Sequence, residues 1–129
     1  MENNGKRKSD FETLEIWKEG RELRIEISAL GKKFPTEEKY RLNDQMIRAS
    51  RSVTANIAEG YGRFHYQENI QFCRTSRGSL YELIDHFITA NDEKYISEET
   101  CNLYKGKINV LIAKINGYIA YLKKRKSED

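Results

Sequence analysis

Cysteine, proline, histidine and long apolar runs are all scarce in this chain of 129 residues. Its two cysteines and two histidines do not follow the spacing of a zinc site, which needs four ligands. One proline and eight glycines argue against a collagen-like or proline-rich disordered chain. No apolar run approaches the roughly 18 residues of a membrane span, and none follows Met1 as in a signal peptide. We therefore expect a soluble, cytoplasmic protein that does not bind membranes.

Recognisable catalytic motifs are missing as well. A di-iron helical protein needs a Glu-x-x-His pair on each of two helices, whereas His86, four residues after Glu82, is the one histidine inside a predicted helix. The chain has neither a nucleophile elbow nor a GxxxxGKS phosphate loop. Gly60-Tyr61-Gly62 follows a predicted helix and not a strand, which excludes a dinucleotide-binding turn. We expect a non-enzymatic protein with no metal, cofactor or small-molecule substrate.

Apolar residues recur at helical spacing in four segments, and no segment alternates with period two. The predicted helices cover about residues 10–31, 36–60, 66–91 and 97–124, between a disordered tail at 1–8 and a C-terminal tail at 125–129. Ser9 with Glu12 fits a capping box, and Ser97 is the predicted cap of the fourth helix. The length suits one domain. Short loops predict an all-α, up-down-up-down four-helix bundle over residues 9–124.

The two cysteines are too far apart in the predicted hairpin to form a disulfide. If the third and fourth helices turn near Lys94, Cys73 lies opposite about residue 115. The axial offset to Cys101 is then about 20 Å, at 1.5 Å for each helical residue. Both cysteines are interpreted as small buried residues of a protein in a reducing compartment.

The apolar stripes are broader than one intrachain core requires. The fourth helix has a heptad-like line through Ile108, Leu111 and Ile115, which Val110 widens. Fourteen aromatic residues, eight of them tyrosine, add to the apolar surface. We expect a second surface to be buried between subunits. Gly78, which lowers helix propensity, is expected to allow close approach of a neighbouring backbone together with Ser76 and Ser79.

Charges are unevenly distributed along the chain, although the formal net charge is only +3. Residues 12–31 carry a net −2 and residues 39–77 a net +4. A basic face for a polyanion is one interpretation. Solvated helix faces are the other, and the sequence pI of about 8.8 lies below that of a dedicated nucleic-acid-binding protein.

The second predicted helix carries a polar stripe beside its apolar one. The stripe comprises Arg41, Gln45, Arg48, Ser52, Asn56, Glu59 and Gly60. In a structural interpretation these side chains make interhelical hydrogen bonds, with Arg48 and Glu59 as partners within or between subunits. In a functional interpretation, arginines bind phosphates through the guanidinium group, and nearby aromatic residues stack on unpaired bases. The phosphate candidates are Arg41, Arg51, Arg63, Arg74 and Arg77, and the stacking candidates are Tyr61, Phe64 and Tyr66.

The same segments resemble a known family. Several short stretches are similar to motifs of the 23S rRNA intervening-sequence proteins. They are Phe34-Pro35, Tyr40-Arg41-Leu42, Gln45, Arg48-Ala49, Ser52-Val53, the run from Asn56 to Arg63, Phe72, and Gly78-Ser79 with Glu82-Leu83. Phe11, Leu14 and Trp17 resemble that family's first helix, so the resemblance covers roughly residues 11–122. It implies a four-helix bundle that forms a homopentameric ring without established enzymatic activity. It also implies kinship with accessory proteins of diversity-generating retroelements, which bind nucleic acid.

Two functions follow as expectations. The first is a bacterial, cytoplasmic homopentamer that acts as a binding or scaffold module for RNA or a ribonucleoprotein. The alternative is a structural or protein-interaction oligomer that contacts no nucleic acid.

Overall fold

The computed structural model describes residues 10–38 and 40–128, which form helices and connecting turns without any β-strand. The prediction of an all-helical chain is therefore confirmed for these residues. The α-helices are α1 (Glu15–Gly31), α2 (Leu42–Gly62), α3 (Tyr66–Asp92) and α4 (Glu98–Glu128), with short 3-10 helices η2 (Asp10–Thr13) and η3 (Thr36–Glu38). None of the described helices combines the length and apolar character of a membrane span.

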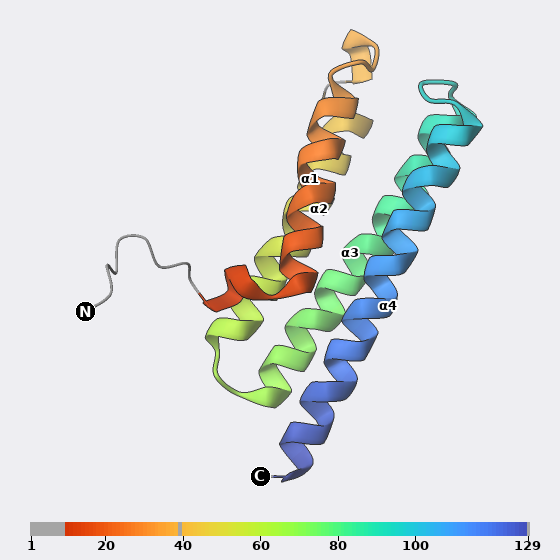
Figure 1. Cartoon of the computed structure of the whole chain (residues 1–129). Helices are drawn as coiled ribbons and strands as arrows, with labels where there is room; N and C mark the ends of the chain where they lie inside the picture. The colour runs from red at the N-terminus through yellow and green to blue at the C-terminus, as the bar shows by residue number, and fades with distance from the viewer. Residues whose placement is uncertain (1–9, 39, 129) are drawn as a thin grey trace.

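Consecutive α-helices lie side by side and run in opposite directions (Figure 1). The α2–α3 loop and the C-terminal turns of α4 consequently lie at the same end of the molecule, shown in green and dark blue (Figure 1). Packing is most extensive between α2 and α3 and between α3 and α4, whereas α1 packs mainly on α2 and only loosely on α4.

Three helix boundaries differ from the predicted ones. The first segment is a 3-10 turn, and α1 begins at Glu15; Ser9 of the predicted capping box lies outside the described residues. The second also opens as a 3-10 turn, and α2 begins at Leu42, whose backbone N–H donates to the Glu38 carboxylate over a long 3.4 Å contact. At the other end α4 continues through residue 128, into the predicted tail 125–129. The predicted tail at 1–8 is outside the described residues.

Ser97 is a cap, as predicted: its hydroxyl accepts the backbone N–H of Thr100 at 3.0 Å, immediately before α4. The other carboxylate oxygen of Glu38 accepts the Tyr95 hydroxyl at 2.7 Å, which ties the start of α2 to the α3–α4 turn. That contact raises the pKa of Tyr95 to about 12, chiefly through the hydrogen bond to Glu38.

The core contains most of the apolar residues that the spacing assigned to it. Its most deeply buried large side chains are Ile27, Met46, Val53, Ile57, Ile70, Leu80, Leu83, Phe87, Ile108, Leu111 and Ile115. Cys73 and Cys101 are buried and free, as expected. Val110, which widens the predicted apolar stripe of the fourth helix, lies outside this core and is half exposed on α4.

Small residues let α2 and α3 pack closely. The Ser76 hydroxyl donates to the Val53 carbonyl at 2.8 Å, and the Ser79 hydroxyl donates to Ser52 at 2.9 Å. The packing role predicted for Gly78 is wrong within this chain, because Gly78 is exposed and a Cβ there would meet nothing within 4 Å. It lies between the two serines in sequence, but a helix turns it away from α2.

Candidate nucleic-acid interface

The candidate arginines differ in whether a carboxylate neutralises them. Arg63, just after α2, pairs with Glu59 at 2.9 Å and with Glu68 at 3.6 Å. Its guanidinium carbon also lies 5.1 Å from the centroid of the Phe72 ring. Within residues 10–38 and 40–128, no carboxylate forms an ion pair with the other candidates; these are Arg41, Arg48, Arg51, Arg74 and Arg77.

These arginines lie in separate grooves and not in one patch. Arg48 lines a polar groove of about 360 Å³ between α2 and α3. Arg51 lines a second groove, between α1 and α2, together with Arg24. Arg77 donates to the Asn116 side-chain oxygen at 2.6 Å, which links α3 to α4. Two further candidates, Arg41 before α2 and Arg74 on α3, are exposed. A polyanion that touched all of them would have to follow more than one face of the molecule.

Part of the polar stripe on α2 makes hydrogen bonds within the helix and to α3. Asn56 donates its amide to the Ser52 hydroxyl at 2.9 Å and to the Ser52 carbonyl at 2.8 Å. Ser52 in turn accepts from Ser79 on α3. Gln45 lines the same α2–α3 groove. This part of the stripe joins two helices.

The predicted pairing of Arg48 with Glu59 does not occur within the chain. Eleven residues of helix separate the two by about 16 Å along the axis, beyond the reach of an ion pair. Glu59 instead pairs with Arg63, one turn further on. Arg48 therefore keeps its charge exposed beside the α2–α3 groove.

The end of α2, the start of α3 and the C-terminal part of α4 lie at one end of the molecule (Figure 1), and aromatic side chains from all three meet there. They line an open hollow of about 260 Å³, called here the aromatic pocket. Its aromatic residues are Tyr61, Phe64, Tyr66, Tyr118 and Tyr121. Such rings can stack on the faces of nucleic-acid bases.

A polar group lies among these rings. Asn69, which is buried, donates its side-chain amide to the Tyr118 hydroxyl over a long 3.4 Å contact. Its amide oxygen accepts the Cys73 thiol. Burial raises the pKa of the Tyr118 hydroxyl, which keeps it protonated and able to donate a hydrogen bond. The pocket thus offers both donors and acceptors beside aromatic faces.

Phe64 is the most unusual residue of the pocket. It adopts φ 58°, a left-handed conformation that β-carbon-bearing residues disfavour, and 84% of its surface is exposed. The conformation ends α2, because the Phe64 backbone N–H bonds the Tyr61 carbonyl. Glycine is the preferred residue at this position of a helix end. A phenylalanine here therefore contributes neither to the turn nor to the core.

Cations lie on the turns of α4 next to the aromatic pocket. The last turns of α4 carry Lys123, Lys124, Arg125 and Lys126 at this end of the molecule (Figure 1). Arg125 lies close enough to Tyr66 and Tyr121 for both to raise its pKa. Lys126 donates to the Gln67 side-chain oxygen at 2.6 Å, across from α4 to α3. This basic rim attracts anionic groups to the pocket.

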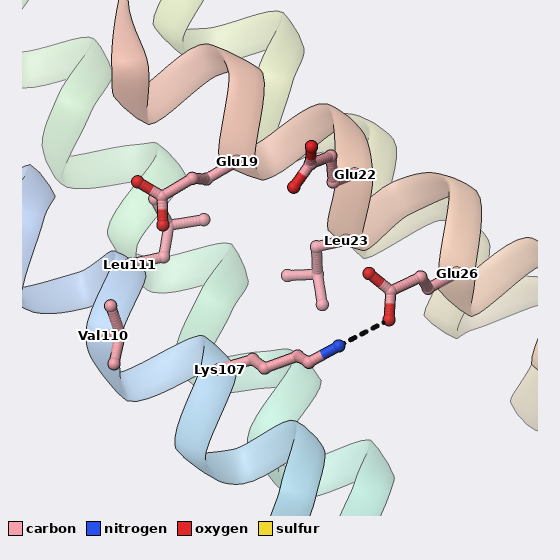
Figure 2. Close-up of a pocket in the computed structure, with 7 residues that line it drawn as sticks. All are labelled: Glu19, Glu22, Leu23, Glu26, Lys107, Val110 and Leu111. Carbon is pink, nitrogen blue, oxygen red and sulfur yellow. Dashed lines mark hydrogen bonds and ion pairs between the residues drawn. The ribbon is translucent and has the colours of Figure 1, made fainter.

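The groove between α1 and α4 is acidic, because carboxylates of α1 face α4 there (Figure 2). Its volume is about 250 Å³, and its residues include Glu19, Glu22, Glu26, Lys107 and Val110. Lys107 pairs with Glu26 at 2.8 Å, and that hydrogen bond raises the lysine pKa. An excess of carboxylates repels phosphates, so this groove is not a nucleic-acid site.

Groups that could bind a metal do not converge in the part of the chain that the structure describes. His86 is buried and its Nε2 lies 2.9 Å from a Glu82 carboxylate oxygen. The pair connects two turns of α3.

Sequence reasoning identified the loop aromatics but missed their partners. Asn69 lies on α3, and Tyr118 and Tyr121 lie on α4, far along the chain from the loop. A signal for them existed. A hairpin turning near Lys94 puts Asn69 opposite about residue 119, by the same arithmetic that separates the two cysteines.

Comparison with known proteins agrees with the helical fold. The sequence pattern of the 23S rRNA-intervening sequence protein family matches residues 12–117. The crystal structure of a protein of unknown function from the S23 ribosomal protein family of Bacteroides thetaiotaomicron is similar, with a TM-score of 0.75 at 18% sequence identity. The similarity covers 81% of this chain and 95% of that one. No curated protein matches this chain significantly. The match over most of the sequence shows that the chain belongs to the 23S rRNA-intervening sequence protein family.

Proposed function

We propose that this protein is a non-enzymatic, RNA-binding module that functions as a subunit of a homopentameric ring in the bacterial cytoplasm. The observation that carries the RNA-binding part is the set of arginines on α2 and α3 without carboxylate partners among the described residues. An exposed guanidinium that no internal carboxylate neutralises is free to bind a phosphate through two hydrogen bonds. RNA or a ribonucleoprotein is the proposed partner.

The contrast with α4 supports this proposal. Lys107 and Lys114 of α4 are both engaged by α1 carboxylates, at 2.8 Å from Glu26 and 2.7 Å from Glu19. These two lysines are thus neutralised by carboxylates of α1, whereas no carboxylate among the described residues pairs with Arg48, Arg51 or Arg74. The basic last turns of α4 lie at the end where α2 and α3 meet and add further cations there.

Exposed apolar residues support the ring. Along α4, an outer stripe runs diametrically opposite the buried line; its residues are Leu103, Gly106, Val110, Ala113 and Gly117. Their spacing of three and four residues is the spacing of a helix-packing seam. The acidic α1–α4 groove beside this stripe is complementary in charge to the arginines of α2. We propose that up-down-up-down four-helix bundles join in this way, the α1–α4 side of one subunit against the α2 side of the next.

Fluorescence anisotropy with a labelled RNA oligonucleotide, titrated over salt, tests the proposed RNA binding. The variant Arg51→Gln/Arg74→Gln removes two unpaired cations. We expect weaker binding, and a log–log salt slope that is shallower by about 0.7 for each single-strand phosphate that the variant no longer binds. Lys107→Gln/Lys114→Gln is the matched control, because it removes the same net charge from the α1–α4 side. If both variants lose the same affinity for RNA, the loss comes from net charge alone, which would contradict the proposal.

The alternative function is a structural or protein-interaction oligomer that binds no nucleic acid. The separation of the arginines into different grooves favours it, because no single face concentrates them. Absence of RNA binding at low salt, with a pentameric mass in light scattering, would decide for this alternative. The arginines would then serve contacts between subunits or with a protein partner.

A further inference from the structure

We propose that the aromatic pocket accepts one unstacked base of a single-stranded RNA. This inference rests on the proposed RNA binding and narrows the partner from RNA in general to unpaired strands. Bases inside a duplex are stacked and paired, so they cannot enter a pocket of about 260 Å³ between helix ends. An unpaired base can turn out of its strand and enter.

The walls of the pocket supply what a base requires. Rings from the loop and from α4 offer aromatic faces, among them the exposed Phe64 and Tyr121. Stacking one base on such rings raises affinity by roughly fivefold to a hundredfold. Asn69 and the Tyr118 hydroxyl are joined by a long 3.4 Å contact, and their donors and acceptors suit the edge of a base.

Phe64 is the residue of the pocket that most strongly indicates a bound ligand. Its left-handed backbone lowers the stability of the isolated chain, and its ring, which is 84% exposed, adds no stability through burial. Glycine at the same place would remove the backbone cost. A residue that costs stability at the mouth of a basic, aromatic hollow is explained if its ring meets a ligand there.

The strand that carries the base has a phosphate on each side of it, and two arginines lie next to residues of the pocket. Arg63 directly precedes Phe64 and lies beside Phe72, and Arg125 lies close to Tyr66 and Tyr121. Arg63 has two carboxylate partners, Glu59 at 2.9 Å and Glu68 at 3.6 Å, whereas Arg125 has one, Glu128 at 3.8 Å, so Arg125 is the less neutralised of the two. A base between two phosphates can be held from both sides.

The experiment uses a single-stranded RNA that carries 2-aminopurine, whose fluorescence is quenched when the base stacks. The same strand annealed to its complement is the duplex probe. We expect at least about tenfold tighter binding of the single strand than of the duplex, with quenching of 2-aminopurine on binding. The free 2-aminopurine riboside, added alone, distinguishes a nucleoside site from a site for RNA. Binding of the riboside as tight as that of the strand would overturn the assignment to RNA.

Phe64→Gly is the decisive variant, and Lys94→Gly is its matched control. Lys94 is the other described residue with a left-handed backbone, φ 64°, in the α3–α4 turn at the far end of the molecule. Both variants should raise the melting temperature, because glycine accepts that conformation without strain. Phe64→Gly should also lower affinity for the single strand about tenfold and abolish quenching, whereas Lys94→Gly should change neither. Tyr121→Leu, which keeps an apolar side chain, should weaken quenching without unfolding.

Three outcomes distinguish failure of the base pocket from failure of RNA binding as a whole. Equal affinity for single strand and duplex, with Phe64→Gly unchanged in binding, would overturn the base pocket and leave RNA binding intact. Failure of the unmodified protein to bind any RNA would overturn the proposed function itself. A change of oligomeric mass in Phe64→Gly, with affinity unchanged, would assign Phe64 to a contact between subunits and also overturn the base pocket.

Discussion

Gly60 determines how closely the end of α2 approaches α3, and thereby where the loop aromatics stand. A Cβ at this position would lie 2.8 Å from the Asn69 side-chain oxygen and 2.8 Å from the Phe72 Cβ. Real Cβ atoms do not come so near, so the two helices would have to move apart. Gly62, two residues later, has nothing within 4 Å of such a Cβ. Two neighbouring glycines of one motif therefore have different roles.

We expect Gly60→Ala to lower the free energy of unfolding by about 1–3 kcal/mol, through overpacking against α3. Gly62→Ala, in the last turn of the same helix, should leave stability unchanged or raise it by up to about 1 kcal/mol, because alanine favours the helix. Urea denaturation of both variants measures the difference. Equal stabilities would show that α3 adjusts to the added methyl group at little cost.

The buried cysteines lead to a second prediction at this scale. Burial raises the pKa of the Cys73 thiol to about 12, so almost none of it is thiolate at pH 8. Cys101 is also buried, with 3% of its surface exposed. We expect the native protein to be inert to a thiol-specific reagent at pH 8 and to release two reactive thiols in denaturant. Rapid reaction of one thiol in the native state would contradict the tight packing around α3.

Helices as elements were predictable, because their apolar lines are long and regular. On α2, positions 42, 46, 49, 53 and 57 are all buried, as their spacing indicated. The starts of the helices were less predictable. Residue 36 begins a 3-10 turn and not a helix, and Glu38 in that turn bonds the Tyr95 hydroxyl, a distant partner that local sequence does not reveal.

Only those residues of the aromatic pocket that are close together in the sequence were predictable. Tyr61, Phe64 and Tyr66 are close in sequence, so a local pattern could identify them. Asn69 and the α4 tyrosines join them only after α3 and α4 pair. The outward position of Gly78 was likewise not predictable from the local pattern. Ser76 and Ser79 bond residues of α2, whereas Gly78, which lies between them in sequence, does not face that helix.

The contact between α2 and α3 gives a prediction at the scale of elements. Ser76 is fully buried, and its hydroxyl donates to the Val53 carbonyl at 2.8 Å. We expect Ser76→Leu to destabilise the fold by at least about 1–3 kcal/mol, because the larger side chain separates the two helices. Gly78→Ala, two residues away on the exposed face, should stabilise it by up to about 1 kcal/mol. Thermal melts followed by circular dichroism compare the two, and a tolerated Ser76→Leu would show that this contact is loose.

At the scale of the whole molecule, opposite charges lie on different sides. The side of α1 and α4 is rich in carboxylates around an apolar floor (Figure 2). The side of α2 carries Arg48 and Arg51, which form no ion pair with a carboxylate of the described residues. Two such sides meet favourably when one subunit follows another head to tail, and a head-to-tail contact closes into a ring when the rotation between subunits permits. The proposed ring and the proposed RNA binding therefore compete for some of the same arginines.

That competition makes the subunit contact on α4 the place to test the ring without disturbing RNA binding. Val110 is 52% exposed in the middle of the outer stripe, beside the acidic groove. We expect Val110→Glu to reduce the mass in light scattering from that of five chains of 15.2 kDa towards that of one, because it buries a charge in the contact. Thr89→Glu adds the same charge on an exposed site of α3 and should leave the mass unchanged. If Val110→Glu releases single chains that still bind RNA, the RNA contacts lie within one subunit. If mass and RNA affinity decrease together, the RNA contacts neighbouring subunits at the same time. An unchanged mass in Val110→Glu would remove the outer stripe of α4 from the proposed ring contact.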